Sequence, residues 1–318
     1  MSTEQQAENR NLAYYCKRFA ELNVSSSKKR GNAPYQPILL LSIIDLIAQG
    51  RIETPQVTVS DELIQTFKQY WDLLGSSAYK GGLHYPFFAL QTQGFWKLKL
   101  KPSFDGLQPK SERKLKEAVE HARLDSQLFH FLQDPVSRSE LIDILISVWF
   151  SESSKQIEEL LQINQTFQDA TQLEIVDRDE RPTVALRKSV IRNAFFRKAI
   201  VHIYDYKCAF CQLKVIRSLT QNIVDGAHIK PFSEFYNSKI ENGISFCKNH
   251  HWAFDRGWFT ISEDYTIIVA EDLQEEFSYG RIMKDFHGEL IELPKSAEYY
   301  PSLESLNWHR TNIFNASF

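Results

Sequence analysis

Apolar residues repeat at intervals of three and four positions in the first quarter of the chain, which predicts helices with one buried side. The first of these helices is indicated by four apolar residues at this spacing: Leu12, Tyr15, Phe19 and Leu22. A longer, almost wholly apolar stretch at residues 34–47 predicts a buried helix entered through Pro37. Residues 52–59 favour a strand, and we predict that Asp61 caps the helix after it.

Between residues 94 and 101 the pattern changes to alternating apolar and basic positions, which is typical of a strand. Such a strand would present three lysines on one face: Lys97, Lys99 and Lys101. By composition alone, a solvated strand face explains these lysines as well as a DNA contact does. Residues 115–150 predict helices with a break at Asp134 and Pro135, and residues 157–163 predict one more helix.

A polar and acidic stretch at residues 164–182 is the best candidate for a linker between two domains. It separates a domain at residues 1–163 from a domain at residues 183–318, and 318 residues are enough for both. The second domain is predicted to begin with a helix at residues 184–206 and to contain a hairpin at residues 258–269. Helices and strands mixed along both halves predict an α+β fold.

The composition is that of an ordinary globular protein, with 43% hydrophobic and 24% charged residues. A net charge of −3 does not indicate a nucleic-acid-binding protein, so any DNA contact must come from local basic clusters. The most apolar stretch, residues 37–48, is too short to span a bilayer and contains Asp45. Residues 1–10 lack the apolar run of a signal peptide, so we expect a cytoplasmic protein with no membrane partner.

Three of the four cysteines lie close together in the second half of the chain, at a spacing that favours zinc. Cys208 and Cys211 form a C-x2-C pair. Cys247 and His250 form a C-x2-H pair, which completes a set of four ligands for tetrahedral Zn2+. We expect the first pair in a knuckle after a helix and the second pair at the start of another helix. Reduced, buried cysteines are the plainer alternative.

The residue after His250 points in another direction, because consecutive helical residues are about 100° apart. His251 and Asp255 share that second face and suit a catalytic Mg2+ or Mn2+ ion. His228 lies in a predicted strand, and a loop with Asn242 precedes the helix. Strand, loop and helix together predict a ββα-metal arrangement, although for His228 alone a histidine satisfied in the core is the usual explanation.

Over roughly residues 195–262 these features resemble the HNH endonuclease family. The resemblance implies that His228 is the general base, which deprotonates water beside the phosphorus atom. It also implies that Asn242 supports the geometry of the active site. His251 and Asp255 would bind the metal ion that stabilises the phosphate and the leaving oxygen.

This chain departs from the family in one position. Many members carry an acidic residue or a histidine immediately before the general base, where this chain has Ala227. Asp225 lies two residues earlier on the same face of the strand, and we take it as a candidate for the missing ligand or orienting group. The departure also leaves open a different class of protein, a zinc-containing DNA-binding module without nuclease activity.

A Tyr-Pro-x-x-Ala sequence begins at Tyr85, between the apolar helix and the basic strand of the first domain. These features resemble, over roughly residues 8–150, the sulfur-binding domain that is found fused to HNH nucleases. That family recognises DNA in which a non-bridging phosphate oxygen is replaced by sulfur. The resemblance indicates candidate contacts at the modified phosphate: Arg30, His84, Tyr85, Pro86 and Ala89. The three lysines of the basic strand would bind neighbouring phosphates.

We therefore predict a modification-dependent endonuclease that recognises phosphorothioate in double-stranded DNA and hydrolyses phosphodiester bonds. One alternative keeps the nuclease but gives the first domain another target, such as methylated cytosine. The other alternative is the non-catalytic zinc-containing DNA-binding protein. Since one HNH centre cuts one strand at a time, a homodimer would account for cleavage of both strands.

Overall fold

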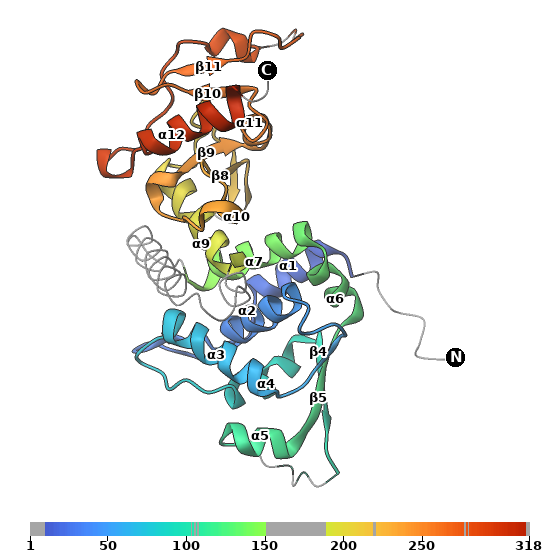
Figure 1. Cartoon of the computed structure of the whole chain (residues 1–318). Coiled ribbons are helices and arrows are strands. Elements are labelled where there is room, and N and C mark those ends of the chain that lie inside the picture. Colours follow the sequence, from blue (N-terminus) through green and yellow to red (C-terminus); the bar gives the residue numbers. More distant parts are fainter. Residues whose placement is uncertain are drawn as a thin grey trace, which may run out of the picture. The chain divides into compact units, whose positions relative to one another are not determined.

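The computed structural model describes residues 10–102, 104, 106, 108–150, 189–218, 221–276, 278 and 280–315. These residues form two compact units, one up to residue 150 with residues 189–191, and one from residue 192 onwards (Figure 1). The linker predicted at residues 164–182 and the helix predicted at residues 157–163 lie outside the described residues, so the domain boundaries stay predictions. No helix in the described part of the chain combines the length and apolar character needed to cross a membrane.

The first unit is mainly helical. Its helical elements are α1 (Leu12–Ala20), α2 (Tyr35–Ala48), α3 (Asp61–Leu74), α4 (His84–Ala89), η1 (Leu90–Gln93), α5 (Glu112–Ala118), α6 (Ser126–Gln133) and α7 (Pro135–Trp149). Helix α2 is buried from Gln36 to Ile47 and packs against α3, α4, α6 and α7. Its charged residue, Asp45, accepts a hydrogen bond from the Tyr70 hydroxyl at 2.8 Å. The apolar stretch therefore forms the centre of this unit, as its sequence predicts.

The start of α3 corrects one prediction. The capping residue is Ser60, whose hydroxyl accepts a hydrogen bond from the Leu63 N–H at 3.1 Å. Asp61 is the first helical residue instead, where its negative charge suits the positive end of the helix dipole. The predicted break is confirmed, because Asp134 caps α7 and Pro135 is the first residue of that helix.

The strands of the first unit are β1 (Ser26–Ser27), β2 (Gly31–Asn32), β3 (Gln56–Val57), β4 (Trp96–Leu100) and β5 (Val119–Leu124). The last three form an antiparallel sheet in the order β3-β5-β4. The strand predicted at residues 52–59 is thus only two residues long. The helices predicted within residues 115–150 are present, and strand β5 lies between two of them. Its Ala, Glu, Arg and Leu residues favour a helix, but pairing with two neighbouring strands decides the outcome.

The second unit contains α9 (Ser189–Ile203), β6 (Ile216–Ser218), β7 (Gln221–Asn222), β8 (Val224–His228), α10 (Phe232–Phe235), η3 (Ile240–Asn242), β9 (Gly243–Cys247), α11 (Lys248–Phe254), β10 (Phe259–Ile261), β11 (Ile267–Val269), η4 (Met283–Phe286), η5 (Ala297–Tyr299), α12 (Leu303–His309) and the π-helical turn η6 (Arg310–Phe314). Strands β8 and β9 pair antiparallel, and α11 follows β9 directly. The ββα arrangement and the β10–β11 hairpin are therefore confirmed. The helix predicted at residues 184–206 ends earlier, at Ile203.

Helix α9 lies unusually close to strand β8. A Cβ atom added at Gly226 would be 2.8 Å from both the Cα and the carbonyl oxygen of Arg197, so only glycine allows this approach. Two residues along the strand, the imidazole of His228 stacks on the Phe196 ring of α9, with centroids 3.8 Å apart. The helix therefore fixes both the position of the strand and the plane of this histidine ring.

Candidate functional site

The four predicted zinc ligands come together in the second unit. Cys208 and Cys211 lie in a tight turn after α9, while Cys247 ends β9 and His250 lies in the first turn of α11. Their ligand atoms all lie within 4.8 Å of one another, and the His250 Nδ1 is 3.1 Å from the Cys247 Sγ. With bonds of about 2.0–2.3 Å, tetrahedral zinc ligands are about 3.5–3.8 Å apart. The cluster therefore fits zinc in chemistry and in size.

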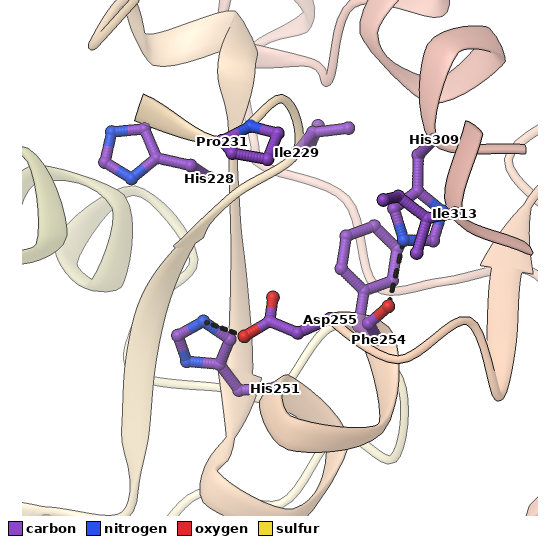
Figure 2. Close-up of a pocket in the computed structure, with 8 residues that line it drawn as sticks. All are labelled: His228, Ile229, Pro231, His251, Phe254, Asp255, His309 and Ile313. Atoms are coloured by element: carbon purple, nitrogen blue, oxygen red, sulfur yellow. Dashed lines mark hydrogen bonds and ion pairs between the residues drawn. The ribbon is translucent and has the colours of Figure 1, made fainter. Parts of the chain in front are cut away.

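A second group of side chains forms on the other side of α11. The His251 Nε2 is 3.7 Å from an Asp255 carboxylate oxygen, and the His251 Nδ1 is 3.8 Å from an Asp225 carboxylate oxygen. Figure 2 shows His251 and Asp255 turned toward each other. His228, the last residue of β8, lines the same pocket. The imidazole of His251 and the carboxylate of Asp255 are donors that suit a divalent cation, while Asp225 lies at the other ring nitrogen.

Asp225 is the acidic residue of this group with the most neighbouring cations. Its carboxylate lies 3.4 Å from the Lys248 Nζ and 3.6 Å from the Arg197 Nε, besides its contact with His251. Burial opposes ionisation of Asp225, but the charges of Arg197 and Lys248, with the contact to His251, outweigh it and hold its pKa below the usual value. Ala227 is buried, so the side chain that approaches His251 from β8 is that of Asp225.

His228 is held in its neutral form. Burial is the largest cause that lowers its pKa to about 3, and the charges of Arg197, Arg192 and His251 add to it. The imidazole is therefore neutral at pH 7. Its Nε2 lies 3.4 Å from the Ser238 Oγ, which positions one of the two ring nitrogens.

Asn242 ties the loop before β9 to the end of β8. The side chain is fully buried, and its Oδ1 accepts a hydrogen bond from the Lys230 N–H at 2.9 Å. Its Nδ2 donates to the carbonyl oxygens of Lys230 at 3.1 Å and of Asn237 at 3.0 Å. These bonds fix the chain just after His228, which is the kind of support that the sequence predicts for Asn242.

The candidate sulfur contacts lie on α4 and beside it. Tyr85 is exposed and Ala89 is partly exposed, but Pro86 is buried. The rings of His84 and Tyr85 are 4.1 Å apart, and Tyr85 is 5.0 Å from Tyr35. Of the three predicted contacts Tyr85, Pro86 and Ala89, Tyr85 and Ala89 are therefore the more accessible.

Arg30 reaches the same aromatic group through Tyr79, because the Arg30 guanidinium carbon is 5.1 Å from the Tyr79 ring and that ring is 5.8 Å from the Tyr35 ring. Tyr79 also donates a hydrogen bond to the carbonyl oxygen of Gly31, next to Arg30, at 2.8 Å. The structure thus connects the loop that bears Arg30 and the Tyr-Pro-x-x-Ala helix through aromatic rings in edge-to-face and tilted contact.

The predicted lysine face is only partly formed. Lys97 and Lys99 lie on β4, but Lys101 follows the end of the strand, and the pairing with β5 shifts register after Lys99. Lys99 forms an ion pair with Glu120 at 2.8 Å, and the Lys101 Nζ donates to the Lys116 carbonyl at 2.7 Å. All three lysines are exposed, but internal contacts already engage two of them.

His309, the last residue of α12, lines the pocket but is not among the residues predicted from the sequence. It stacks on Phe254 at 3.7 Å and lies 2.9 Å from the Phe254 carbonyl oxygen through Nε2 (Figure 2). Since a carbonyl only accepts, Nε2 carries the proton and Nδ1 accepts from the Thr260 hydroxyl, also at 2.9 Å. His309 therefore holds the residue next to Asp255. Nothing in the local sequence indicates a contact that spans 55 positions.

Two family models match the chain. The model described as "ScoMcrA-like, DNA sulfur-binding domain" matches residues 13–163, and the model described as "HNH endonuclease" matches residues 208–262. The two models thus match separate parts of the chain. The chain carries a ScoMcrA-like DNA sulfur-binding domain followed by an HNH endonuclease domain, the latter with a Cys3His cluster that could bind zinc.

Two solved structures are similar to parts of the chain. "Modification dependent TagI restriction endonuclease" has 20% identity and a TM-score of 0.29, and the match covers 39% of each chain. "Sulfur binding domain of SprMcrA complexed with phosphorothioated DNA" has 19% identity and a TM-score of 0.36 over 48% of this chain and 93% of that chain. The match thus spans well under half of the TagI enzyme. No curated protein sequence matches this chain.

Burial of His309 predicts a pH-dependent contribution to stability. Burial is the largest cause that lowers its pKa to about 4, and the unfolded residue has a pKa near 6.5. Below about pH 6.5 His309 binds a proton in the unfolded state, whereas in the folded state it binds one only below about pH 4. The stabilisation by neutral His309 is therefore complete above pH 6.5 and is lost as the pH falls toward 4.

We therefore expect His309→Gln to lower the free energy of unfolding at pH 7.5, and the difference from the unsubstituted protein to shrink by about 1.4 kcal/mol per pH unit between pH 6.5 and pH 4. Denaturant titrations across this range measure the difference. His130→Gln, at an exposed position of α6, controls for the loss of an imidazole. A difference that stays constant with pH would contradict the assigned protonation state.

Proposed function

We propose that this chain is a modification-dependent endonuclease that recognises phosphorothioate DNA through its first unit and hydrolyses phosphodiester bonds through its second. The observation that carries the proposal is the grouping of a neutral His228 with His251 and Asp255 in one pocket of an HNH domain, with Asp225 in contact with His251. The sulfur-binding domain in the same chain supplies the class of target.

In the proposed reaction His228 acts on the attacking water. The Nε2 lies 3.4 Å from the Ser238 Oγ, and the other ring nitrogen, Nδ1, would take a proton from water as the water attacks phosphorus. Burial keeps this ring unprotonated before the reaction, and the same burial disfavours the imidazolium that proton transfer forms. Asn242 keeps the strand end that bears His228 in place.

His251 and Asp255 would hold a Mg2+ or Mn2+ ion. When bound, such an ion supplies positive charge that stabilises the phosphate and the leaving oxygen. Asp225 would align the imidazole of His251, which it approaches from the side opposite Asp255. This gives Asp225 the place that Ala227 leaves unfilled.

Zn2+ is the ion proposed for the Cys3His cluster. It would join the knuckle after α9 to the start of α11 and so fix the helix on which His251 lies. A homodimer and a cytoplasmic location stay predictions.

For zinc we expect about one ion per chain in the purified protein, because the ligand spacing fits a closed tetrahedral site. Cys208→Ser should release the zinc and lower the melting temperature of the second unit, since metal binding is coupled to folding. Cys16→Ser, at the free cysteine of the first unit, is the matched control. Elemental analysis that finds no zinc in folded, active protein would remove this assignment.

For catalysis we expect His228→Ala to lower the rate of DNA cleavage at least 100-fold while DNA affinity changes little, because the base acts on water. His251→Ala and Asp255→Ala should also lower cleavage and reduce Mn2+ binding measured by calorimetry. Asp264→Ala, on the exposed turn of the β10–β11 hairpin, controls for removal of a nearby carboxylate. Cleavage at a normal rate by the His228 variant would rule out this mechanism.

For recognition we expect the His228→Ala protein to bind a phosphorothioate duplex more tightly than the same duplex without sulfur. Tyr85, Pro86 and Ala89 would form an apolar surface around the modified phosphate. A phosphate oxygen there loses water without gaining a hydrogen bond, which costs about 1–3 kcal/mol, whereas sulfur loses less because it is less strongly hydrated. Ala89→Ser and Tyr85→Ala should reduce this preference. Lys97→Ala should weaken both duplexes about equally, because phosphate contacts are not specific for sulfur.

Both affinities are measured at one fixed salt concentration and in several sequence contexts. Equal affinity for the two duplexes in every context would rule out phosphorothioate recognition and favour recognition of another modification, such as methylated cytosine. Absence of metal-dependent cleavage of any DNA would instead favour the non-catalytic DNA-binding protein.

A further inference from the structure

Two exposed tryptophans lie beside the proposed active site. Trp252 is 47% exposed and Trp258 is 38% exposed, and their rings meet edge to face at 4.8 Å. The Arg256 guanidinium carbon lies 4.1 Å above the Trp252 ring, and one of its nitrogens donates to the Trp252 carbonyl at 3.1 Å. Large aromatic surfaces left in contact with water are unfavourable and commonly mark binding sites.

The geometry of α11 places this cluster on the same face as the metal-binding residues. At about 100° per residue, positions 251, 252, 255 and 256 fall within an arc of about 140°. All four side chains are at least partly exposed, while Ala253 and Phe254 point into the core. His251 and Asp255 form one edge of the exposed face, and Trp252 and Arg256 form the other. A phosphate bound at the first edge brings its neighbouring nucleotides to the second.

The end of the helix holds the cluster rigidly. The Gly257 N–H donates to the Phe254 carbonyl and the Trp258 N–H donates to the Ala253 carbonyl, each at 3.0 Å, which is the Schellman pattern. Gly257 has a φ of 68°, as this pattern requires. The Ala270 N–H then donates to the Trp258 carbonyl at 2.9 Å. Both sides of Trp258 are thus tied to regular structure, so its ring needs little ordering when it binds a ligand.

A Schellman ending is often accompanied by an apolar contact between the residues that Trp252 and Trp258 occupy. That contact alone explains why both residues are apolar. It does not explain two indoles that leave 47% and 38% of their surface exposed, or the arginine stacked on one of them, since leucines would close the same contact. Aromatic rings with a stacked arginine are the combination with which proteins bind nucleotides.

We propose that Trp252, Arg256 and Trp258 form a DNA-binding platform, on which the nucleotides that flank the cut phosphate pack against the indoles while Arg256 binds a neighbouring phosphate. The positive charge of Arg256 complements the DNA backbone, and the position on α11 next to His251 and Asp255 fits the occupant. This inference rests on the proposed nuclease function. The platform positions the strand to be cut and takes no part in proton transfer.

The leucine variants Trp252→Leu and Trp258→Leu, singly and together, separate the two explanations, because leucine keeps the apolar helix ending but removes the aromatic faces. We expect melting temperatures close to that of the unsubstituted protein, and a loss of at least 10-fold in kcat/KM for DNA cleavage, mostly through KM. Leu290→Ala, at a position that is 64% exposed in the same unit, is the matched control for loss of an exposed apolar side chain.

Arg256→Gln provides a second measurement that does not depend on tolerance of the leucines. In the His228→Ala background, which binds but does not cut, we expect weaker DNA binding and a salt dependence of log Kd reduced by about one phosphate contact. Intrinsic fluorescence should be quenched less by DNA in the leucine variants than in the parent protein.

Unchanged kcat/KM in the double leucine variant, together with an unchanged salt dependence in Arg256→Gln, would overturn the platform while leaving the nuclease function intact. If the unsubstituted protein cleaves no DNA, the proposed function fails instead. The fluorescence and salt measurements on binding would then still decide whether DNA lies on the tryptophans.

Discussion

The second unit depends on one property of the α-helix, the rotation of about 100° between consecutive residues. His250 and His251 are neighbours in sequence, yet the first faces the three cysteines and the second faces Asp225 and Asp255. The single helix α11 therefore separates two sites with different chemistry, sulfur and imidazole on one side and carboxylate and imidazole on the other. A helix of seven residues has little stability alone, so the cluster at its start and His309 at its end both matter for the position of His251.

Much of the second unit was predictable because its chemistry is encoded in short spacings. The C-x2-C and C-x2-H pairs predict the cluster, and the i, i+4 spacing of His251 and Asp255 predicts their shared face. The approach of Asp225 was foreseen only as a substitute for the residue missing at Ala227. His309 was not predictable, because its contact with Phe254 depends on how the tail folds back, and no periodicity encodes that path. The sequence contains Trp252 and Trp258 but does not indicate that both rings are exposed and in contact with each other.

In the first unit the helices were predicted better than the strands. The run of apolar residues in α2 is unambiguous, because an almost wholly apolar helix of this length must be buried. Strand β5 was hidden, since its residues favour a helix and only pairing with β3 and β4 makes it a strand. The same pairing explains why the lysine face is incomplete, because Glu120 of β5 lies close enough to bind Lys99. Sequence alternation shows which residues share a face but not which charges stand opposite them.

The missing side chain at Gly226 has a mechanical consequence. Because the backbone of α9 lies where a Cβ atom would be, and Phe196 of the same helix stacks on His228, the strand and the helix can move only together. A displacement of α9 along its axis would shift the His228 imidazole relative to His251 and Asp255, although no residue of the pocket had been substituted. The rate of DNA cleavage would then depend on the position of α9, although no residue of α9 lines the pocket.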